Sequence, residues 1–204
     1  MTVILDYGIG NVSSIYNMMN RLGIQSMISG KELDVMNADK IILPGVGHFD
    51  YCMKQLKHAD FFETLNLKVL KEKTPVLGVC VGCQMLMESS EEGVESGLGW
   101  VSGKVVKFNI ESLPVGLKVP HMAWTDVDVK QNHRLYSDIL DPRFYFVHSY
   151  HLLCNDTNDI TATATYGYEF VASVQKGNIQ GVQFHPEKSH KFGMKLYENF
   201  NRYF

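Results

Sequence analysis

The sequence contains no run of about 18 consecutive apolar residues, the minimum that a membrane-spanning helix needs. Its first residues, Met1 to Asp6, lack the basic start and the apolar stretch of a secretory signal. Its four cysteines, at positions 52, 80, 83 and 154, are too few for the disulfide framework of a small secreted domain. These absences predict a cytoplasmic protein whose thiols are free.

A cluster of basic residues is also missing. The 19 Lys and Arg are scattered, and together with the 22 Asp and Glu they give a formal charge of -3. Without a basic patch there is no electrostatic footprint for a phosphate backbone, so nucleic acid is not expected as a partner. Internal repeats and linkers are absent as well. A chain of 204 residues that is 45% hydrophobic therefore predicts one domain over residues 1–204.

Strand and helix signals alternate in the first half of the chain. Asn11 can cap a helix whose apolar residues recur at helical spacing up to Leu22, and Gly23 then ends it. Parallel strands need a crossover long enough to hold a helix, so the alternation predicts an α/β fold with a mostly parallel open sheet flanked by helices. The expected strands are 2–6, 24–28, 40–43 and 76–79, and the expected helical segments are 11–22, 48–73 and 84–88.

The second half is richer in β-branched and aromatic residues. It predicts an added antiparallel or mixed β region, with Lys176-Gly177-Asn178 as a hairpin turn. A last helix is expected from about Ser189 to Tyr203. The expected strands are 101–108, 125–129, 144–147, 160–165, 170–175 and 179–184.

The segment Gly78-Val79-Cys80-Val81-Gly82 has the form of a nucleophile elbow with cysteine in place of serine. It follows the apolar strand 76–79 and precedes a helical pattern. Cys80 would therefore lie at the carboxyl end of a strand, where open α/β sheets bind ligands, and at a helix N-terminus, which favours the thiolate. The backbone N–H of Val81 would be free to stabilise an oxyanion.

Two other interpretations of this segment stay open. Cys80 could be a buried small apolar residue between two packing glycines. Cys80 and Cys83 also form a C-x-x-C pair, which could indicate redox chemistry or two metal ligands, although no further metal ligands stand at a recognisable spacing. A disulfide between them would make an enzyme sensitive to oxidation.

His185-Pro186-Glu187 follows a β-rich segment, so the histidine would also emerge at a strand end. An imidazole can share the proton of a cysteine nucleophile and later protonate a leaving group. Glu187 could accept the other ring N–H and fix the tautomer. Both require that this strand belong to the same sheet as Cys80. The alternative is a surface turn, with Glu187 merely favouring the N-terminus of the last helix.

Six blocks, in order over nearly the whole chain, resemble the class I, triad-type glutamine amidotransferases, and among them the glutaminase subunits of imidazole glycerol phosphate synthases in histidine biosynthesis. Each block alone is only moderately specific, but their shared order is highly specific. The blocks are residues 6–11 (DYGIGN), 43–49 (LPGVGHF), 78–84 (GVCVGCQ), 120–124 (PHMAW), 145–150 (YFVHSY) and 181–189 (GVQFHPEKS).

The resemblance implies a flavodoxin-like fold and a Cys80, His185 and Glu187 triad that hydrolyses L-glutamine through a glutamyl thioester. It implies oxyanion donors at Val81 and Val46, with the Val46 amide turned away until the partner is loaded. Glycines on both sides of Val46 make such a peptide rotation sterically easy.

The resemblance also implies a substrate site and a partner. The ammonia would pass to a synthase or cyclase subunit in a heterodimer, and no cofactor is expected in this chain. Trp124 and Tyr145 could instead belong to the core, Gln84 could be an exposed helical residue, and Glu92 could belong to a solvated acidic face. The implied glutamine contacts are Gly45, Gly47, Gln84, Glu92, His148, Ser149 and Tyr150, and the implied partner contacts are Asn11, Trp124, Tyr145 and Lys188.

Three residues depart from the pattern. Ala123 and Thr125 stand where histidine-pathway subunits usually have Gly and Asn, and Cys83 stands where Met is usual. Because these positions are expected near the partner, the chain could be a paralogue that supplies ammonia for amination of a sugar precursor in surface polysaccharide biosynthesis. A stand-alone cysteine hydrolase or peptidase and a non-catalytic binding module remain as further alternatives.

Overall fold

A computed structural model describes residues 1–130 and 133–204. Its centre is a set of five parallel strands, whose spatial order is β2-β1-β3-β4-β12. All residues of β1, β4 and β12 are buried, because helices cover both faces of the sheet. The five strands are β1 (Thr2–Leu5), β2 (Ser26–Ser29), β3 (Lys40–Gly45), β4 (Val76–Cys80) and β12 (Ile179–Val182).

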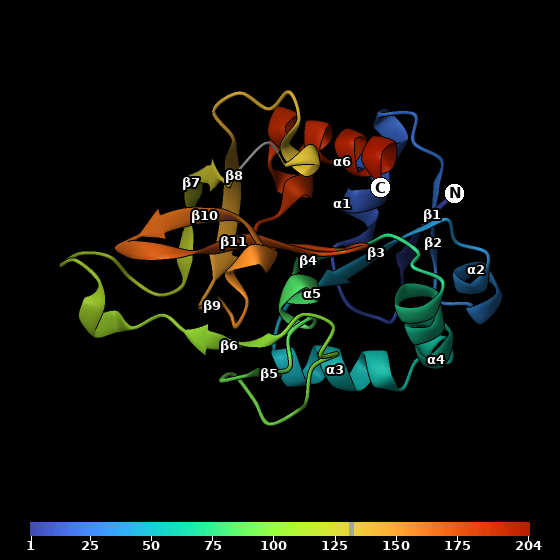
Figure 1. Ribbon diagram of the computed structural model, residues 1–204, viewed down its shortest axis with the longest axis horizontal. Coiled ribbons are helices and arrows are strands. Elements are labelled where there is room, and N and C mark those ends of the chain that lie inside the picture. Colours follow the sequence, from blue (N-terminus) through green and yellow to red (C-terminus); the bar gives the residue numbers. More distant parts are fainter. Residues whose placement is uncertain (131–132) are drawn as a thin grey trace.

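Helices form a layer on each side of this sheet (Figure 1). In that view α1 (Val12–Arg21) and α6 (His190–Tyr203) lie above the sheet, and α3 (Phe49–Lys57) and α4 (Phe62–Asn66) lie below it. The other helical segments are α2 (Glu32–Met36), the π-helix η1 (Leu67–Lys71), α5 (Val81–Gln84) and the 3-10 turns η2 (Ile110–Ser112), η3 (Arg134–Tyr136), η4 (Thr157–Asp159) and η5 (Pro186–Lys188).

The sheet continues into an antiparallel half beyond β12. The order is β12-β11-β10-β7-β8, while β9 pairs with β11 and with β6. The hairpin between β11 and β12 turns at 177–178 and joins the two halves, as the Lys176-Gly177-Asn178 motif predicts. These strands are β5 (Ser89–Ser90), β6 (Gly103–Lys107), β7 (His121–Val129), β8 (Arg143–His148), β9 (Tyr150–Cys154), β10 (Ile160–Tyr166) and β11 (Tyr168–Lys176).

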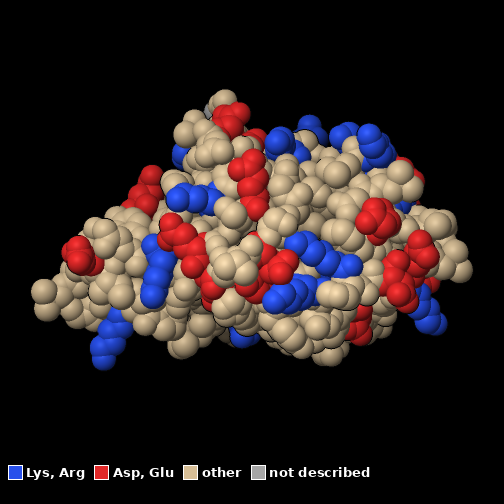
Figure 2. Space-filling model, turned by 90° about the horizontal axis from the view of Figure 1, so that it is seen from below, with Lys and Arg blue, Asp and Glu red and all other residues tan. Residues whose placement is uncertain are grey.

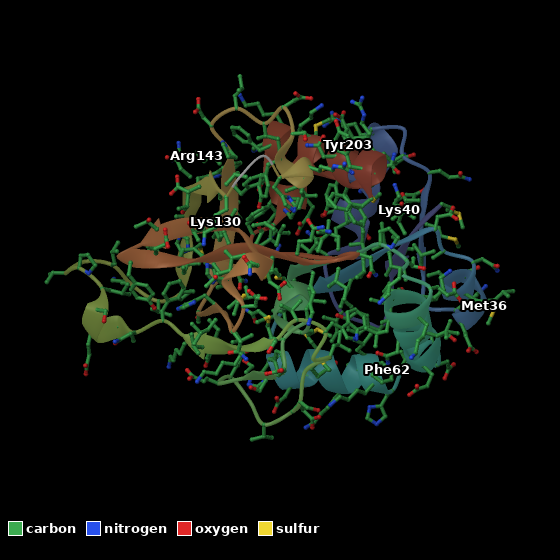
Figure 3. The ribbon with its side chains drawn as sticks, viewed as in Figure 1. Met36, Lys40, Phe62, Lys130, Arg143 and Tyr203 are labelled. Atoms are coloured by element: carbon green, nitrogen blue, oxygen red, sulfur yellow. The ribbon has the colours of Figure 1, made fainter. Side chains whose placement is uncertain are left out.

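One continuous apolar core runs through both halves of the sheet. Side chains fill the space between the sheet and the helices, with Phe62 below the sheet and Tyr203 above it (Figure 3). Phe144, Phe146 and Phe184 are fully buried and pack as aromatic pairs between β8 and the end of β12. This packing connects the antiparallel half to the segment that carries His185.

The expected α/β class with a mixed second half is confirmed, but several local expectations differ from the structure. The helix expected at 84–88 instead covers Val81–Gln84, and the sequence patterns did not indicate α2, β5 or β9. Strand β3 also continues through Pro44, whose missing N–H costs nothing there. Alternate residues of β3 donate to β4, whereas Pro44 faces β1, whose pairing with β3 ends at Ile42.

None of the helices in the described parts of the chain is long and apolar enough to cross a membrane. The molecular face seen from below Figure 1 carries acidic and basic side chains interspersed with each other (Figure 2). On that face no large area of positive charge is visible, in agreement with the scattered charges of the sequence.

Candidate active site

Cys80 is the last residue of β4, and the chain turns there into α5. Its backbone has φ 54° and ψ -113°, a conformation that a residue with a side chain adopts at a strained turn. Gly82 makes this turn possible, because a Cβ on it would lie 2.0 Å from the carbonyl oxygen of Leu43. The elbow expected from the sequence is present, but α5 has only four residues. Its dipole is therefore a smaller influence on Cys80 than the sequence suggested.

His185 follows β12, and β12 pairs with β4 in parallel. The register places Gly181 beside Gly78 and Val182 beside Val79. Parallel neighbours end at the same edge of a sheet, so Cys80 and His185 emerge side by side although 105 positions separate them. The shared sheet that the sequence analysis required is present.

The carboxylate of Glu187 holds the imidazole of His185. Nδ1 of His185 donates to Oε1 of Glu187 over 2.8 Å, and both side chains are almost completely buried. Burial alone would lower the pKa of His185, but the Cys80 sulfur and the Glu187 carboxylate outweigh it and raise this pKa to about 10. Glu187 is thus not a surface residue, and its bond to Nδ1 leaves Nε2 available toward Cys80.

A cavity of about 340 Å³ opens beside these groups. Its lining includes Cys80, His185 and both Val46 and Val81. Among the seven implied glutamine contacts, Gly45 is the exception, because it packs directly against the start of α5 instead. The others that line the cavity are Gly47, Gln84, Glu92, His148, Ser149 and Tyr150, and Pro120, Val147 and Lys188 complete it.

Gln84 and Glu92 each have a defined structural position. Gln84 is buried, so the alternative of an exposed helical residue is wrong, and its Nε2 donates to the carbonyl of Tyr150 and to Oε1 of Gln183 over 3.1 Å. Oε2 of Glu92 accepts the N–H of Phe49 over 2.8 Å, at the start of α3. Glu92 therefore lines the cavity while also capping a helix, and it is not part of a purely solvated face.

The backbone N–H groups of two residues lie at the cavity, and that of Val46 has no acceptor within residues 1–130 and 133–204. The two residues are Val46, in the turn after β3, and Val81, directly after Cys80. Backbone N–H groups beside a nucleophile can stabilise a negatively charged oxygen.

His148 was expected as a glutamine contact, but the chain of hydrogen bonds that connects it to the buried His121 was missed by the sequence analysis. Nδ1 of His148 donates to the carbonyl of Tyr150 over 2.8 Å, Nδ1 of His121 donates to Nε2 of His148 over 3.0 Å, and the hydroxyl of Thr125 donates to Nε2 of His121 over 2.8 Å. Burial lowers the pKa of His148 to about 3 and that of His121 to about 4, so both rings are neutral. His121 stood inside the PHMAW block, which was the signal that could have indicated it.

Three of the four implied partner residues lie together. The indole of Trp124 is edge-on to Tyr145 at 6.2 Å and stacked on His190 at 5.5 Å, and Lys188 Nζ lies 5.9 Å from the Tyr145 ring. Neither Trp124 nor Tyr145 belongs to the core. Asn11 precedes α1, but its side chain does not cap the helix. Ser189 links this cluster to the site, because its hydroxyl accepts from the Tyr145 N–H and donates to the His185 carbonyl.

Cys83 lies in the core and not near a partner-facing surface. It is fully buried, and its sulfur packs so closely on β12 that a Cβ on Gly181 would come within 2.6 Å of it. Burial raises the pKa of the Cys83 thiol well above its ordinary value, and Cys80 and Cys83 are both free. Across the described residues there is no group of three or more His, Cys, Asp or Glu side chains that could hold a metal ion. Neither the redox nor the metal interpretation of C-x-x-C gains support.

Comparison with known proteins gives a consistent result. The model of the family "Glutamine amidotransferase class-I" matches residues 3–202. The chain is 48% identical to "Imidazole glycerol phosphate synthase subunit HisH 2" of Methanococcus maripaludis over 201 residues, and 45% identical to the protein of the same name from Pseudomonas aeruginosa, with 98% of each chain covered in both cases.

Solved structures agree on the fold. A structure described as "Crystal structure of glutamine amidotransferase" superposes with a TM-score of 0.74 at 19% identity and covers 97% of this chain and 96% of the other. "Structure of PurLQS from Thermotoga maritima" gives a TM-score of 0.73 at 19% identity and covers 99% of this chain and 97% of the other.

Proposed function

The chain belongs to the class I glutamine amidotransferases, and from this premise we propose that it is the glutaminase subunit of an imidazole glycerol phosphate synthase. In this proposal it hydrolyses L-glutamine and delivers the ammonia to the cyclase subunit in histidine biosynthesis. Its similarity to two HisH subunits over 98% of their length supports this assignment.

The observation on which the mechanism depends is the pairing of β4 with β12, which brings the Cys80 sulfur beside an imidazole already bound to Glu187. In the proposed starting state the His185 ring, whose pKa is raised to about 10, carries the proton and lies beside the Cys80 sulfur that attacks the amide. Glu187 stabilises the imidazolium and fixes its orientation.

The proposed reaction has two halves. The Cys80 thiolate attacks the carboxamide carbon of glutamine, and His185 gives its Nε2 proton to the amide nitrogen, so that ammonia leaves and a glutamyl thioester remains. Water then gives a proton to His185 and attacks the thioester as hydroxide. Collapse of the second tetrahedral intermediate releases glutamate and restores the thiolate and the imidazolium.

Positions around the cavity suggest how the intermediate is held. We propose that the Val46 and Val81 N–H groups bind the oxyanion, and that the implied contacts from Gln84, Glu92, His148, Ser149, Tyr150 and Gly47 hold the amino acid head group. Gly45 acts differently from a direct contact: its lack of a side chain lets the turn approach α5, because a Cβ there would lie 2.3 Å from the Gly82 nitrogen.

The partner would dock on the side formed by Trp124, Tyr145, Lys188 and Asn11. Residues 1–204 would act as one glutamine amidotransferase domain in a heterodimer, located in the cytoplasm. The proposed chemistry needs no cofactor, because a thioester formed and hydrolysed on one cysteine requires only water. Any ATP or metal requirement of the complete reaction would belong to the synthase.

The test is a glutaminase assay of the chain alone and with the cyclase subunit. Glutamine hydrolysis should be slow alone, should rise when the cyclase and its imidazole-pathway ligand are added, and should disappear in Cys80→Ala. If the rate responds only to a sugar-aminating synthase and its substrate, the paralogue is the correct assignment. Turnover of peptides or esters without any partner would contradict both.

A further inference from the structure

Two buried side chains from different parts of the chain donate hydrogen bonds to the turn from Pro44 to Gly47. The hydroxyl of Tyr7, which follows β1, donates to the carbonyl of Pro44. The thiol of Cys52, in α3, donates to the carbonyl of Val46 over 3.3 Å. Tyr7 is only 7% exposed and Cys52 is fully buried, so water does not compete for these carbonyls.

Both donors keep their protons throughout the neutral range. Burial raises the pKa of Tyr7 well above its ordinary value, and burial raises the pKa of Cys52 to about 12. Neither group takes part in the proposed chemistry, and neither lines the cavity. The Tyr7 hydroxyl also lies 3.8 Å from the Met85 sulfur, but the Pro44 carbonyl is its oxygen acceptor.

The two carbonyls that accept these hydrogen bonds lie on either side of one peptide unit. The Pro44 carbonyl belongs to the peptide before Gly45, and the Val46 carbonyl belongs to the peptide before Gly47. Between them stands the Gly45–Val46 peptide, whose N–H has no acceptor within the described ranges 1–130 and 133–204. Each neighbouring peptide has its carbonyl bonded to a buried donor, and this limits the orientations open to the Gly45–Val46 peptide between them.

We infer that Tyr7 and Cys52 are positioning residues that anchor both ends of the peptide carrying the Val46 N–H, the proposed oxyanion donor. This inference rests on the proposed function, and it assigns a role to two residues outside the triad and outside the substrate cavity. A turn held at both ends restricts the orientations of the donor, and such preorganisation lowers the barrier without improving substrate binding. The contacts should therefore act on kcat and not on KM.

The experiment measures kcat and KM for glutamine in the complex with the cyclase. Cys52→Ala removes the thiol donor, Cys52→Ser keeps a donor, and Tyr7→Phe removes only the hydroxyl. We expect kcat to fall about tenfold in Cys52→Ala and Tyr7→Phe with KM within about twofold, because misplacing a donor costs less than the ~10²-fold loss on removing one. Cys52→Ser should recover most of the rate.

Cys154→Ala is the matched control, since Cys154 is half-buried in β9 and does not line the cavity. Thermal unfolding of every variant separates loss of rate from loss of fold. An unchanged or increased kcat in folded Cys52→Ala, or a Cys52→Ser rate as low as that of Cys52→Ala, would overturn the inference. Absence of glutamine hydrolysis in the unmodified complex would instead overturn the proposed function.

Discussion

The imidazole of His185 owes its properties to two neighbours from separate parts of the fold. Glu187 binds Nδ1 from two residues along the chain, and Cys80 approaches from the adjacent strand. Their effect on the pKa of His185 outweighs that of burial, which alone would favour the neutral ring. The protonation of His185 should therefore contribute to the pH dependence of the folded protein's stability.

Removing the Glu187 charge tests this dependence. A pKa raised from 6.5 to about 10 on folding stabilises the protein fully below pH 6.5, and this contribution is lost as the pH rises toward 10. In Glu187→Gln the pKa of His185 should fall. Denaturant unfolding of both proteins should then show a difference in unfolding free energy that is largest below pH 6.5 and shrinks toward pH 10. A difference that is constant over this window would contradict the account.

At the residue scale, the sequence predicts those site residues that stand within short local motifs. Cys80 and His185 stand out because glycines, an apolar strand and a following proline mark their local turns. The burial of Gln84 and the contact of Cys52 with Val46 depend on how β9 and α3 pack across the chain. The sequence pattern around a residue contains no information on such contacts with distant parts of the chain.

At the scale of elements, the close approach of β3 to α5 shapes the site. Gly82 has no room for a side chain, because a Cβ would meet the Leu43 carbonyl at 2.0 Å and neither backbone can yield easily. Gly82→Ala should destabilise the protein by about 3 kcal/mol or more through overpacking. Gly177→Ala is the control, since its Cβ would meet open space and only its φ of 58° would be unfavourable, a cost of about 1 kcal/mol. Equal unfolding free energies of the two variants would argue against the crowding.

The hydrogen-bond chain from β7 to β8 gives a second prediction. Thr125→Val keeps the shape of the side chain but leaves Nε2 of His121 buried without its donor. The unfolding free energy should fall by about 1–3 kcal/mol, the usual cost of an unpaired buried polar group. Thr125→Ser retains the hydroxyl and should lose clearly less. Chemical denaturation of both variants decides this, and equal losses would show that the hydroxyl does not matter.

Elements were predictable where periodicity or turn chemistry is strong. The parallel strands are continuous apolar runs, and the β11–β12 hairpin turns at a clear Gly-Asn signal. Strand β9 was missed because it is short and its pairing with β6 and β11 depends on tertiary position. Helix α5 is displaced from its expected range because the strained backbone at Cys80 starts the helix at once.

At the scale of the whole molecule, the Trp124, Tyr145 and Lys188 cluster provides a surface at the far end of the sheet from β2. Trp124→Ala should weaken binding of the cyclase by about tenfold or more, since large aromatics dominate interface energies. Leu33→Ala, at an exposed apolar position of α2, is the control and should bind as the unmodified chain does. Isothermal titration calorimetry measures both. If Trp124→Ala binds as tightly as Leu33→Ala, the partner docks elsewhere.

The overall architecture followed from the sequence because alternating strands and helices leave few ways to bury both sheet faces. The acceptor substrate does not follow in the same way, since in the proposed function it binds to the partner. Ala123 and Thr125 illustrate the limit. Both lie in β7, and Thr125 serves the internal His121 chain, so its departure from the usual Asn is compatible with an internal role as well as with a different partner.

The most direct test of the account is to trap the covalent intermediate on Cys80. The complex should be mixed with glutamine, quenched in acid within a turnover and digested for mass spectrometry. The peptide that contains Cys80 should carry a glutamyl group in thioester linkage, and Cys80→Ala should carry none. Turnover of glutamine without this adduct, or an adduct on another cysteine, would contradict the assignment of Cys80 as nucleophile.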